Sequence, residues 1–156
     1  MSWVPHITVA SIIEQDNKFL FVEEYVDDTK VINQPAGHLE EHETLEEGCI
    51  RETLEETLYA VKVDYLVGIY QERNKNSLDM WLRFCFKCSI IQEIANGELD
   101  KNIIRKIWLP RDAILNPNIN LRSNMVIKCI DDYNAGKKFP KEIISSLLEK
   151  WMKRLL

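Results

Sequence analysis

The 156-residue sequence predicts a single α/β domain, spanning residues 1–156, in which strands dominate the middle of the chain and helices are interspersed. Two patterns predict this class. Short runs rich in β-branched residues recur between polar turns, which is typical of strands. Other segments carry helix caps or apolar residues at helical spacing. The composition, 46% hydrophobic and 29% charged, is ordinary for a globular protein with a buried core.

The chain begins with two predicted strands. Residues 6–15 (HITVASIIEQ) and 18–25 (KFLFVEEY) are rich in β-branched and aromatic residues. The Asp16–Asn17 pair between them is a turn signal, so the two strands are expected to pair as a hairpin. Residues 31–37 (VINQPAG) follow a polar loop, and their proline and glycine are expected to break regular structure.

A helix is predicted from Thr44 to Thr57. Thr44 is a candidate N-cap, and Glu47 stands three residues later, where a capping box needs an acidic or amide side chain. The chain then contains three further runs with strand composition, at residues 61–72, 78–91 and 103–110.

The C-terminal third is predicted to contain a helical turn at 111–115 and two helices. The first helix, residues 125–134, is ended by Gly136. The second, residues 140–156, starts with a proline and carries one apolar stripe. Packing of this stripe on the same domain gives a monomer, and packing on a second copy gives a homodimer. The stripe consists of Ile143, Ile144, Leu147, Leu148, Trp151 and Leu155.

The four cysteines are predicted to be buried thiols rather than a disulfide frame or a zinc site. Cys85 and Cys88 form a C-x-x-C pattern inside a strand-like run, where an odd separation sends the two side chains to opposite faces. No second C-x-x-C completes a zinc site. The sequence shows no signal peptide and no 18-residue apolar run, so a cytoplasmic location and no membrane partner are expected.

Acidic residues are concentrated in one segment. Residues 37–59 hold eight glutamates and one basic residue, while the rest of the chain is close to neutral, with nineteen basic and seventeen acidic residues. The absence of a basic stripe argues against a nucleic-acid partner. Glutamates at the start of the predicted helix are favoured by the helix dipole, but those near its end are not.

The late glutamates of this segment share one helix face. Glu52, Glu55 and Glu56 are related as i, i+3 and i+4, so their carboxylates repel one another unless a cation lies among them. Arg51 alone cannot neutralise three carboxylates. Oxygen ligands suit Mg²⁺, with Mn²⁺ as an alternative, so the spacing favours a divalent-cation site. The alternative is a plain solvated helix surface.

The spacing of this segment resembles the Nudix box. The matching residues are Gly37, Glu43, Arg51, Glu52, Glu55 and Glu56. The sequence departs from the box pattern at Thr53 and Tyr59, where aliphatic residues are usual, and at Leu58, where glycine is usual. The missing glycine leaves open how the helix ends, with an extra helical turn as one possibility.

The resemblance extends beyond the box. "PHITVASII", "NQPAGHLE", "LRF", "NLRS" and the Tyr133–Pro140 pattern are similar to the NudJ phosphatase branch of the family. The family resemblance implies an α/β/α sandwich around a mixed β-sheet, with the last helix as an addition. It also implies a Mg²⁺-dependent hydrolase that releases phosphate from nucleoside tri- and diphosphates. Hydroxymethylpyrimidine diphosphate and thiamine diphosphate are implied as further small-molecule substrates.

The resemblance also implies roles for individual residues. Glu55 and Glu56 are metal ligands, Glu52 is a ligand or the general base, and Arg51 orients these carboxylates through Glu43. Gly37 offers its backbone carbonyl to the metal. The implied catalytic set is Arg51, Glu52 and Glu55, and the implied metal set is Gly37, Glu52, Glu55, Glu56 and Asp100.

The expected metal ligand Asp100 lies in a polar loop before a late strand, and a solvated loop acid is the equal alternative. Three further residues are expected to contact substrate, on sequence signals that are less specific than the box pattern. Gln34 and His38 flank the Pro-Ala-Gly turn, and Arg122 is a candidate for a terminal phosphate. A salt bridge or a solvated surface position explains Arg122 equally well.

Two rival functions remain at this stage. One is a catalytically silent Nudix module that binds a nucleotide or a partner, although the intact charged positions argue against it. The other is a Nudix enzyme that releases pyrophosphate from a different substrate. The sequence does not rank substrates or identify the general base.

Overall fold

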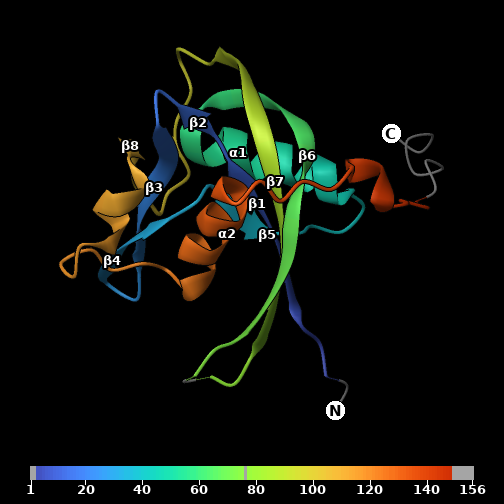
Figure 1. The fold of residues 1–156 in the computed structure, drawn as a ribbon, viewed down its shortest axis with the longest axis horizontal. Coiled ribbons are helices and arrows are strands. Elements are labelled where there is room, and N and C mark those ends of the chain that lie inside the picture. Colours follow the sequence, from blue (N-terminus) through green and yellow to red (C-terminus); the bar gives the residue numbers. More distant parts are fainter. Residues whose placement is uncertain (1–2, 76, 149–156) are drawn as a thin grey trace.

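A computed structural model describes residues 3–75 and 77–148, which form two four-stranded sheets and two α-helices (Figure 1). The first sheet has the order β5 (Ala36–His38), β1 (His6–Ile12), β7 (Met80–Glu93) and β6 (Tyr59–Arg73). Strand β1 runs parallel to β7, and the other pairs are antiparallel, so this sheet is mixed. The long β6–β7 hairpin projects beyond the rest of the molecule (Figure 1).

The second sheet is antiparallel and centred on β3 (Lys18–Val26). Strand β3 pairs with β2 (Glu14–Gln15), β4 (Thr29–Asn33) and β8 (Ile103–Leu109). The helices are α1 (Leu45–Thr57) and α2 (Asn124–Asn134), with single 3₁₀ turns η1 (Arg111–Leu115) and η2 (Lys141–Ile143).

The two α-helices cover opposite faces of the mixed sheet. Alternate residues of β1 divide between two apolar clusters: Val9 belongs to the cluster that contains Cys49 of α1, and Ala10 to the cluster that contains Val126 of α2. Alternation along a strand places successive side chains on opposite faces. The predicted α/β class and the α/β/α layering are therefore confirmed.

Helix α1 begins with the predicted cap. The Thr44 hydroxyl accepts from the Glu47 backbone N–H (3.1 Å), and the Glu47 carboxylate accepts from the Thr44 backbone N–H (2.9 Å), which completes the capping box. The helix ends at Thr57 without an extra turn. Leu58, which stands in place of the usual glycine, adopts the left-handed conformation itself (φ 60°) and lies close to Gly97.

Three strand predictions need correction. Residues 6–15 do not form one strand that pairs with 18–25, because β1 ends at Ile12 in the mixed sheet and only β2 forms the hairpin with β3. The predicted loop ends earlier, because β4 begins at Thr29. Residues 36–38 form β5, since pairing with β1 at the sheet edge outweighs the breaking effect of the nearby proline and glycine.

The C-terminal predictions are partly right. The turn η1 and helix α2 are confirmed, and Gly136 follows α2 with a positive φ of 79°. The helix predicted for 140–156 is wrong over its described part. Pro140 starts only the 3₁₀ turn η2, and residues 144–148 have no regular structure, while 149–156 lie outside the described residues.

All four cysteines are buried free thiols, as predicted. Cys85 and Cys88 lie in opposite apolar clusters, which confirms that their odd separation divides them between the two faces of the sheet. A search of the described helices finds none that is long and apolar enough to span a membrane.

The cap of α1 gives a stability prediction. We expect Thr44→Ala to lower the free energy of unfolding by about 1 kcal/mol, because the Glu47 backbone N–H loses its acceptor. Thr44→Ser keeps the hydroxyl and is the matched control, with most of the stability retained. Urea titrations measure both variants, and equal midpoints for Thr44→Ala and the wild type would contradict this account of the helix start.

Candidate active site

The guanidinium of Arg51 connects α1 to the segment that precedes it. Nε and Nη2 donate to the two oxygens of Glu43 (2.9 and 2.7 Å). Nη1 donates to Glu52 (2.9 Å) and Glu55 (3.0 Å), and Nη2 also donates to the His38 carbonyl (3.1 Å). All five N–H donors of the guanidinium are therefore used. The carboxylates raise the pKa of Arg51, so it stays charged.

Glu43 is the carboxylate most tightly held by this arginine. Its hydrogen bonds with Arg51 lower the pKa of Glu43, so it remains ionised and acts as the anchor of the guanidinium. Glu43 Oε1 also accepts from the Glu40 backbone N–H (2.8 Å). A Cβ at Gly48 would come within 2.7 Å of the same oxygen, so glycine at that position lets the carboxylate approach the helix.

Strand β5 brings Gly37 against Glu52. A Cβ at Gly37 would lie 2.2 Å from the Glu52 carboxyl carbon, so a larger residue there would displace the Glu52 carboxylate from this position. Glu52 is half-buried on α1, and burial raises its pKa against the lowering effect of Arg51. The carboxylates of Glu55 and Asp100 add to the rise.

Glu56 is the most deeply buried carboxyl group of the site, with 6% of its surface exposed. The Ala36 backbone N–H donates to Glu56 Oε2 (2.9 Å). Burial raises the pKa of Glu56 to about 9, and the carboxylates of Glu24, Glu52 and Asp100 add to the rise. No arginine or lysine within the described ranges forms an ion pair with Glu56, so its negative charge has no counter-ion there.

Asp100 lies beside the same helix. Its backbone N–H donates to the Glu55 carbonyl (3.0 Å), and its charge contributes to the raised pKa of both Glu52 and Glu56. The structure thus brings this loop acid to the carboxylates named from the sequence. Its side chain accepts from the Lys101 backbone N–H (3.2 Å) and is exposed.

The residues suit a hard divalent cation in chemistry. They offer carboxylate oxygens, which Mg²⁺ and Mn²⁺ prefer, and the crowded negative charge around Glu56 favours a cation. Within residues 3–75 and 77–148, no group of three or more His, Cys, Asp or Glu side chains is already arranged to hold a metal ion. Two of the expected ligands, Glu52 and Glu55, are instead joined by Arg51.

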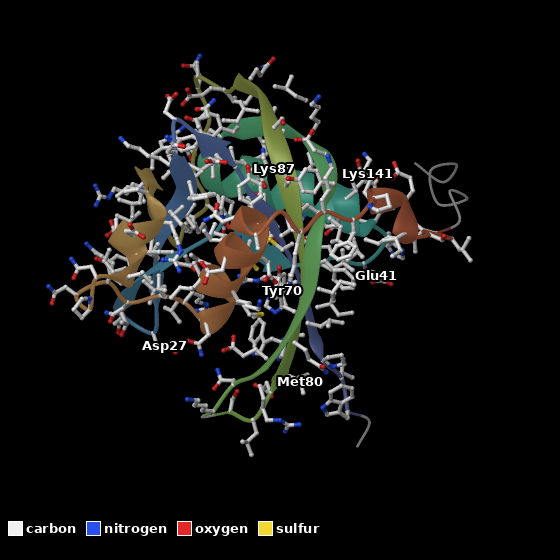
Figure 2. The ribbon with its side chains drawn as sticks, in the orientation of Figure 1. Asp27, Glu41, Tyr70, Met80, Lys87 and Lys141 are labelled. Carbon is white, nitrogen blue, oxygen red and sulfur yellow. The ribbon has the colours of Figure 1, made fainter. Side chains whose placement is uncertain are left out.

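The residues expected to contact substrate lie beside a separate cavity. Arg122 lines a cavity of about 480 Å³. Asp27, at the turn between β3 and β4, lines the same cavity and is labelled in Figure 2. Gln34 is buried and does not line this cavity, but it accepts from Arg83 (3.2 Å), which does. None of the carboxylates of Glu52, Glu55 and Glu56 lines this cavity.

His38 lies near the cavity in a group of rings. Its ring is 5.3 Å from that of Trp81, a cavity residue, and its Nε2 is 3.2 Å from Nδ1 of His6. His6 in turn stacks on Trp81 at 4.4 Å. Burial lowers the pKa of His38, and the charges of His6 and Arg122 add to this effect, so His38 is neutral near pH 7.

The structure adds two charged residues that the sequence patterns did not single out. The charge of Glu24 on β3 adds to the raised pKa of Glu56, and the side-chain amide of Asn33 donates to Glu24 at 3.1 Å. Arg83 of β7 reaches the cavity. Glu24 carried no usable signal, because its place beside Glu56 depends on how the second sheet packs on α1. Arg83 stands within the family-like "LRF" run, where a charged residue inside an apolar strand was the available signal.

Comparison with known proteins gives a consistent result. A family model described as the NUDIX domain matches residues 4–128. The chain is 36% identical over 140 residues to proteins named Phosphatase NudJ from Escherichia coli and Shigella flexneri, and the match covers 90% of this chain and 90% of each relative.

Solved structures show the same fold. A NUDIX hydrolase from Nitrosomonas europaea superposes with a TM-score of 0.88 at 38% identity, covering 92% of this chain and 97% of the other. The MutT protein from Methanosarcina mazei Go1 superposes with a TM-score of 0.69 at 19% identity, covering 88% and 99%, and supports the fold alone. The Nudix-type architecture predicted from the sequence is confirmed.

The buried carboxyl group gives a pH prediction for the metal-free protein. Glu56 holds its proton up to about pH 9 when folded, whereas the reference value for glutamate is 4.5. The folded state therefore binds more protons in this window, and the free energy of unfolding falls as the pH rises through it. We expect a fall of roughly 1 kcal/mol per pH unit around neutrality, measured by urea titration in chelator.

Glu56→Gln should flatten this slope, because the amide stays neutral and can still accept from the Ala36 backbone N–H. Glu41→Gln removes a carboxylate that is 86% exposed and should follow the wild-type curve. A wild-type slope that persists in Glu56→Gln would show that another group carries the proton.

Proposed function

The chain belongs to the NUDIX family and is a Nudix hydrolase, and from this premise we propose that it uses Mg²⁺, or alternatively Mn²⁺, to cleave phosphoanhydride bonds and release phosphate. The proposed substrates are nucleoside tri- and diphosphates and two thiamine-related compounds, hydroxymethylpyrimidine diphosphate and thiamine diphosphate. These are small molecules, and no nucleic-acid or membrane partner is proposed. We propose a cytoplasmic location and a monomer or homodimer.

The observation that carries this proposal is the surplus of negative charge at one end of α1. The charge of Arg51 compensates Glu43, and its remaining donors are shared between Glu52 and Glu55. The ionised form of Glu56 is disfavoured by burial and by three neighbouring carboxylates. A site of this kind gains stability when a divalent cation is bound. The same charge would repel a polyphosphate if no cation were present.

The residues divide into three roles. Gly37, Glu52, Glu55, Glu56 and Asp100 are the proposed metal ligands, with Glu52 or Glu55 also available as the general base. Arg51 is a positioning residue, because it fixes the carboxylates relative to the segment before the helix. A bound cation would neutralise phosphate oxygens and lower the pKa of its water. Gln34, His38 and Arg122 are the proposed substrate contacts.

Release of phosphate rather than pyrophosphate is supported by the relatives named Phosphatase NudJ. Two observations support turnover over a silent binding module. The charged positions of the helix are intact, and the pKa of Glu56 lies far from that of a solvated glutamate, as is common at catalytic sites. Pyrophosphate release from a different substrate remains the second candidate, and the products distinguish the two.

The first test is product analysis with and without Mg²⁺. We expect the wild-type protein to release orthophosphate from at least one member of a panel of nucleoside and pyrimidine diphosphates, and chelator to abolish release. Glu55→Gln should lower kcat by roughly 10²- to 10⁴-fold, because a ligand or base is lost while the helix is kept. Glu41→Gln is the surface control and should keep wild-type kcat.

Pyrophosphate as the only phosphorus product would replace the phosphatase assignment with the second candidate. No product from any phosphoanhydride, in protein that is folded and binds nucleotide, would favour the silent module.

A second prediction concerns Arg51. Arg51→Lys keeps the positive charge but removes the two parallel hydrogen bonds to Glu43. We expect kcat to fall roughly 10- to 100-fold with the far-ultraviolet circular dichroism unchanged. The apparent Mg²⁺ affinity, measured from the dependence of rate on Mg²⁺ concentration, should weaken with it. Wild-type Mg²⁺ dependence in Arg51→Lys would mean that the guanidinium does not position the ligands.

A further inference from the structure

Arg83 is a buried cation without a counter-ion. Only 4% of its surface is exposed, and it forms no ion pair with any acid in the described parts of the chain. Nη1 donates to the neutral amide oxygen of Gln34, and Nε has no hydrogen-bond partner. A buried charge of this kind is costly, because it loses water and gains no opposite charge. Its persistence in the fold points to a ligand that supplies the missing charge.

A second unpartnered group lies beside it. In the mixed sheet, Thr8 of β1 pairs in register with Arg83 of β7 on one side and with His38 of β5 on the other. The three side chains therefore share one face of the sheet. Thr8 Oγ1 is buried and has no hydrogen-bond partner among the described residues. A hydroxyl and a guanidinium that lie side by side can both donate to an oxygen-rich anion.

The cavity above Arg83 has a matching charge. Its lining includes the cations Arg73, Lys75, Arg83 and Arg122 and the anions Asp27 and Glu72. The side chains that line the cavity therefore carry a net positive charge, whereas the carboxylate site on α1 is strongly negative. A neutral carbonyl group on the ring of a ligand would accept one hydrogen bond from Arg83 but would leave the positive charge of Arg83 uncompensated. A phosphate group satisfies both requirements, because it offers several acceptors and a negative charge.

One short segment connects this cavity to the carboxylate site. Asn33 donates to Glu24, which lies near Glu56, and the Ala36 backbone N–H donates to Glu56 directly. Between them, Gln34 accepts from Arg83. Gln34 and Ala36 are two residues apart, so their backbones are at most about 7 Å from each other. Arg83 and the carboxylate site therefore contact the same short segment, close enough for one substrate to place neighbouring phosphates at both.

We propose that Arg83 binds the phosphate group that stays on the organic product, while the phosphate to be released lies at the carboxylate site. This inference rests on the proposed function and assigns the second half of its substrate site. Thr8 adds a neutral donor, and Arg122 lies at the exposed edge of the cavity. For a nucleoside diphosphate, the group that remains bound at Arg83 is the nucleoside monophosphate.

The test measures binding of the product without any divalent cation. Isothermal titration calorimetry in chelator compares cytidine monophosphate with cytidine on the wild-type protein and on Arg83→Met, which keeps a long apolar side chain. We expect the wild-type protein to bind cytidine monophosphate at least about tenfold more tightly than cytidine. Arg83→Met should lose this difference and weaken the monophosphate roughly 10- to 100-fold.

Arg111→Met is the matched control, since it removes an arginine paired with Asp131 outside the cavity. It should bind cytidine monophosphate as the wild-type protein does. The proposal is overturned if Arg83→Met binds the monophosphate within twofold of the wild type, if cytidine binds the wild type equally well, or if the wild type shows no binding at millimolar concentrations.

Stability separates a ligand-binding role from a packing role. Without ligand, Arg83→Met should melt at or above the wild-type temperature, because an uncompensated buried charge is removed. A lower melting temperature together with unchanged monophosphate binding would assign Arg83 to packing and overturn the proposal.

Kinetics then separates this inference from the proposed function. Arg83→Met should raise KM about tenfold or more while kcat changes little, whereas Glu55→Gln should lose kcat and keep metal-free monophosphate binding. Absence of turnover in the wild type would defeat the proposed function while leaving the calorimetric test of Arg83 intact. A kcat loss in Arg83→Met with unchanged KM would contradict a binding role.

Discussion

The site depends on one guanidinium that has fewer donors than its surroundings have acceptors. Arg51 uses all five N–H groups on Glu43, Glu52, Glu55 and the His38 carbonyl. Because these partners come from β5, from the segment before α1 and from α1 itself, the arginine fixes three parts of the backbone with one side chain. A larger residue at Gly48 would displace the Glu43 carboxylate that contacts Arg51, and a larger residue at Gly37 would displace the Glu52 carboxylate. The positions of the two glycines and of the glutamates in this segment therefore all depend on the contacts of Arg51.

The same shortage of positive charge explains the state of Glu56. Arg51 has no donor left for it, and its remaining neighbours are carboxylates and a backbone N–H. Without a cation, the lower-energy state keeps the proton on Glu56. A divalent cation has to displace this proton and compete with Arg51 for Glu52 and Glu55, so metal binding is expected to strengthen as the pH rises. The charge imbalance that makes the metal-free site costly is also what gives a cation its binding energy.

The sequence predicted local features well, because their causes are local. The spacing of Glu52, Glu55 and Glu56 fixes their common helix face, and the capping box depends only on Thr44 and Glu47. Strand β5 escaped prediction because its stability comes from pairing with β1, about thirty residues away. Glu24 escaped for a similar reason, since its effect on Glu56 depends on how the second sheet packs on α1, whereas Arg83 offered a signal as a charged residue inside an apolar strand. Over the described part of the last predicted helix, the apolar stripe does not act as one packing face, because Ile144 packs against the apolar cluster of α1 while Ile143 and Leu147 are exposed.

Two opposite charge imbalances therefore lie on either side of the segment from Asn33 to His38. On one side, carboxylate oxygens outnumber the donors of Arg51, and on the other, Arg83 has no carboxylate partner among the described residues. These charges do not cancel each other, because Glu56 is held by the Ala36 backbone N–H and Arg83 is bonded to the Gln34 side chain, at separate points of that segment. A direct Arg83–Glu56 pair would be more stable than either group alone, yet Gln34 and Ala36 contact them separately. Under the proposals made above, a substrate with two phosphates would resolve both imbalances at once, because a cation held by the carboxylates would neutralise one phosphate and the guanidinium of Arg83 would bind the other.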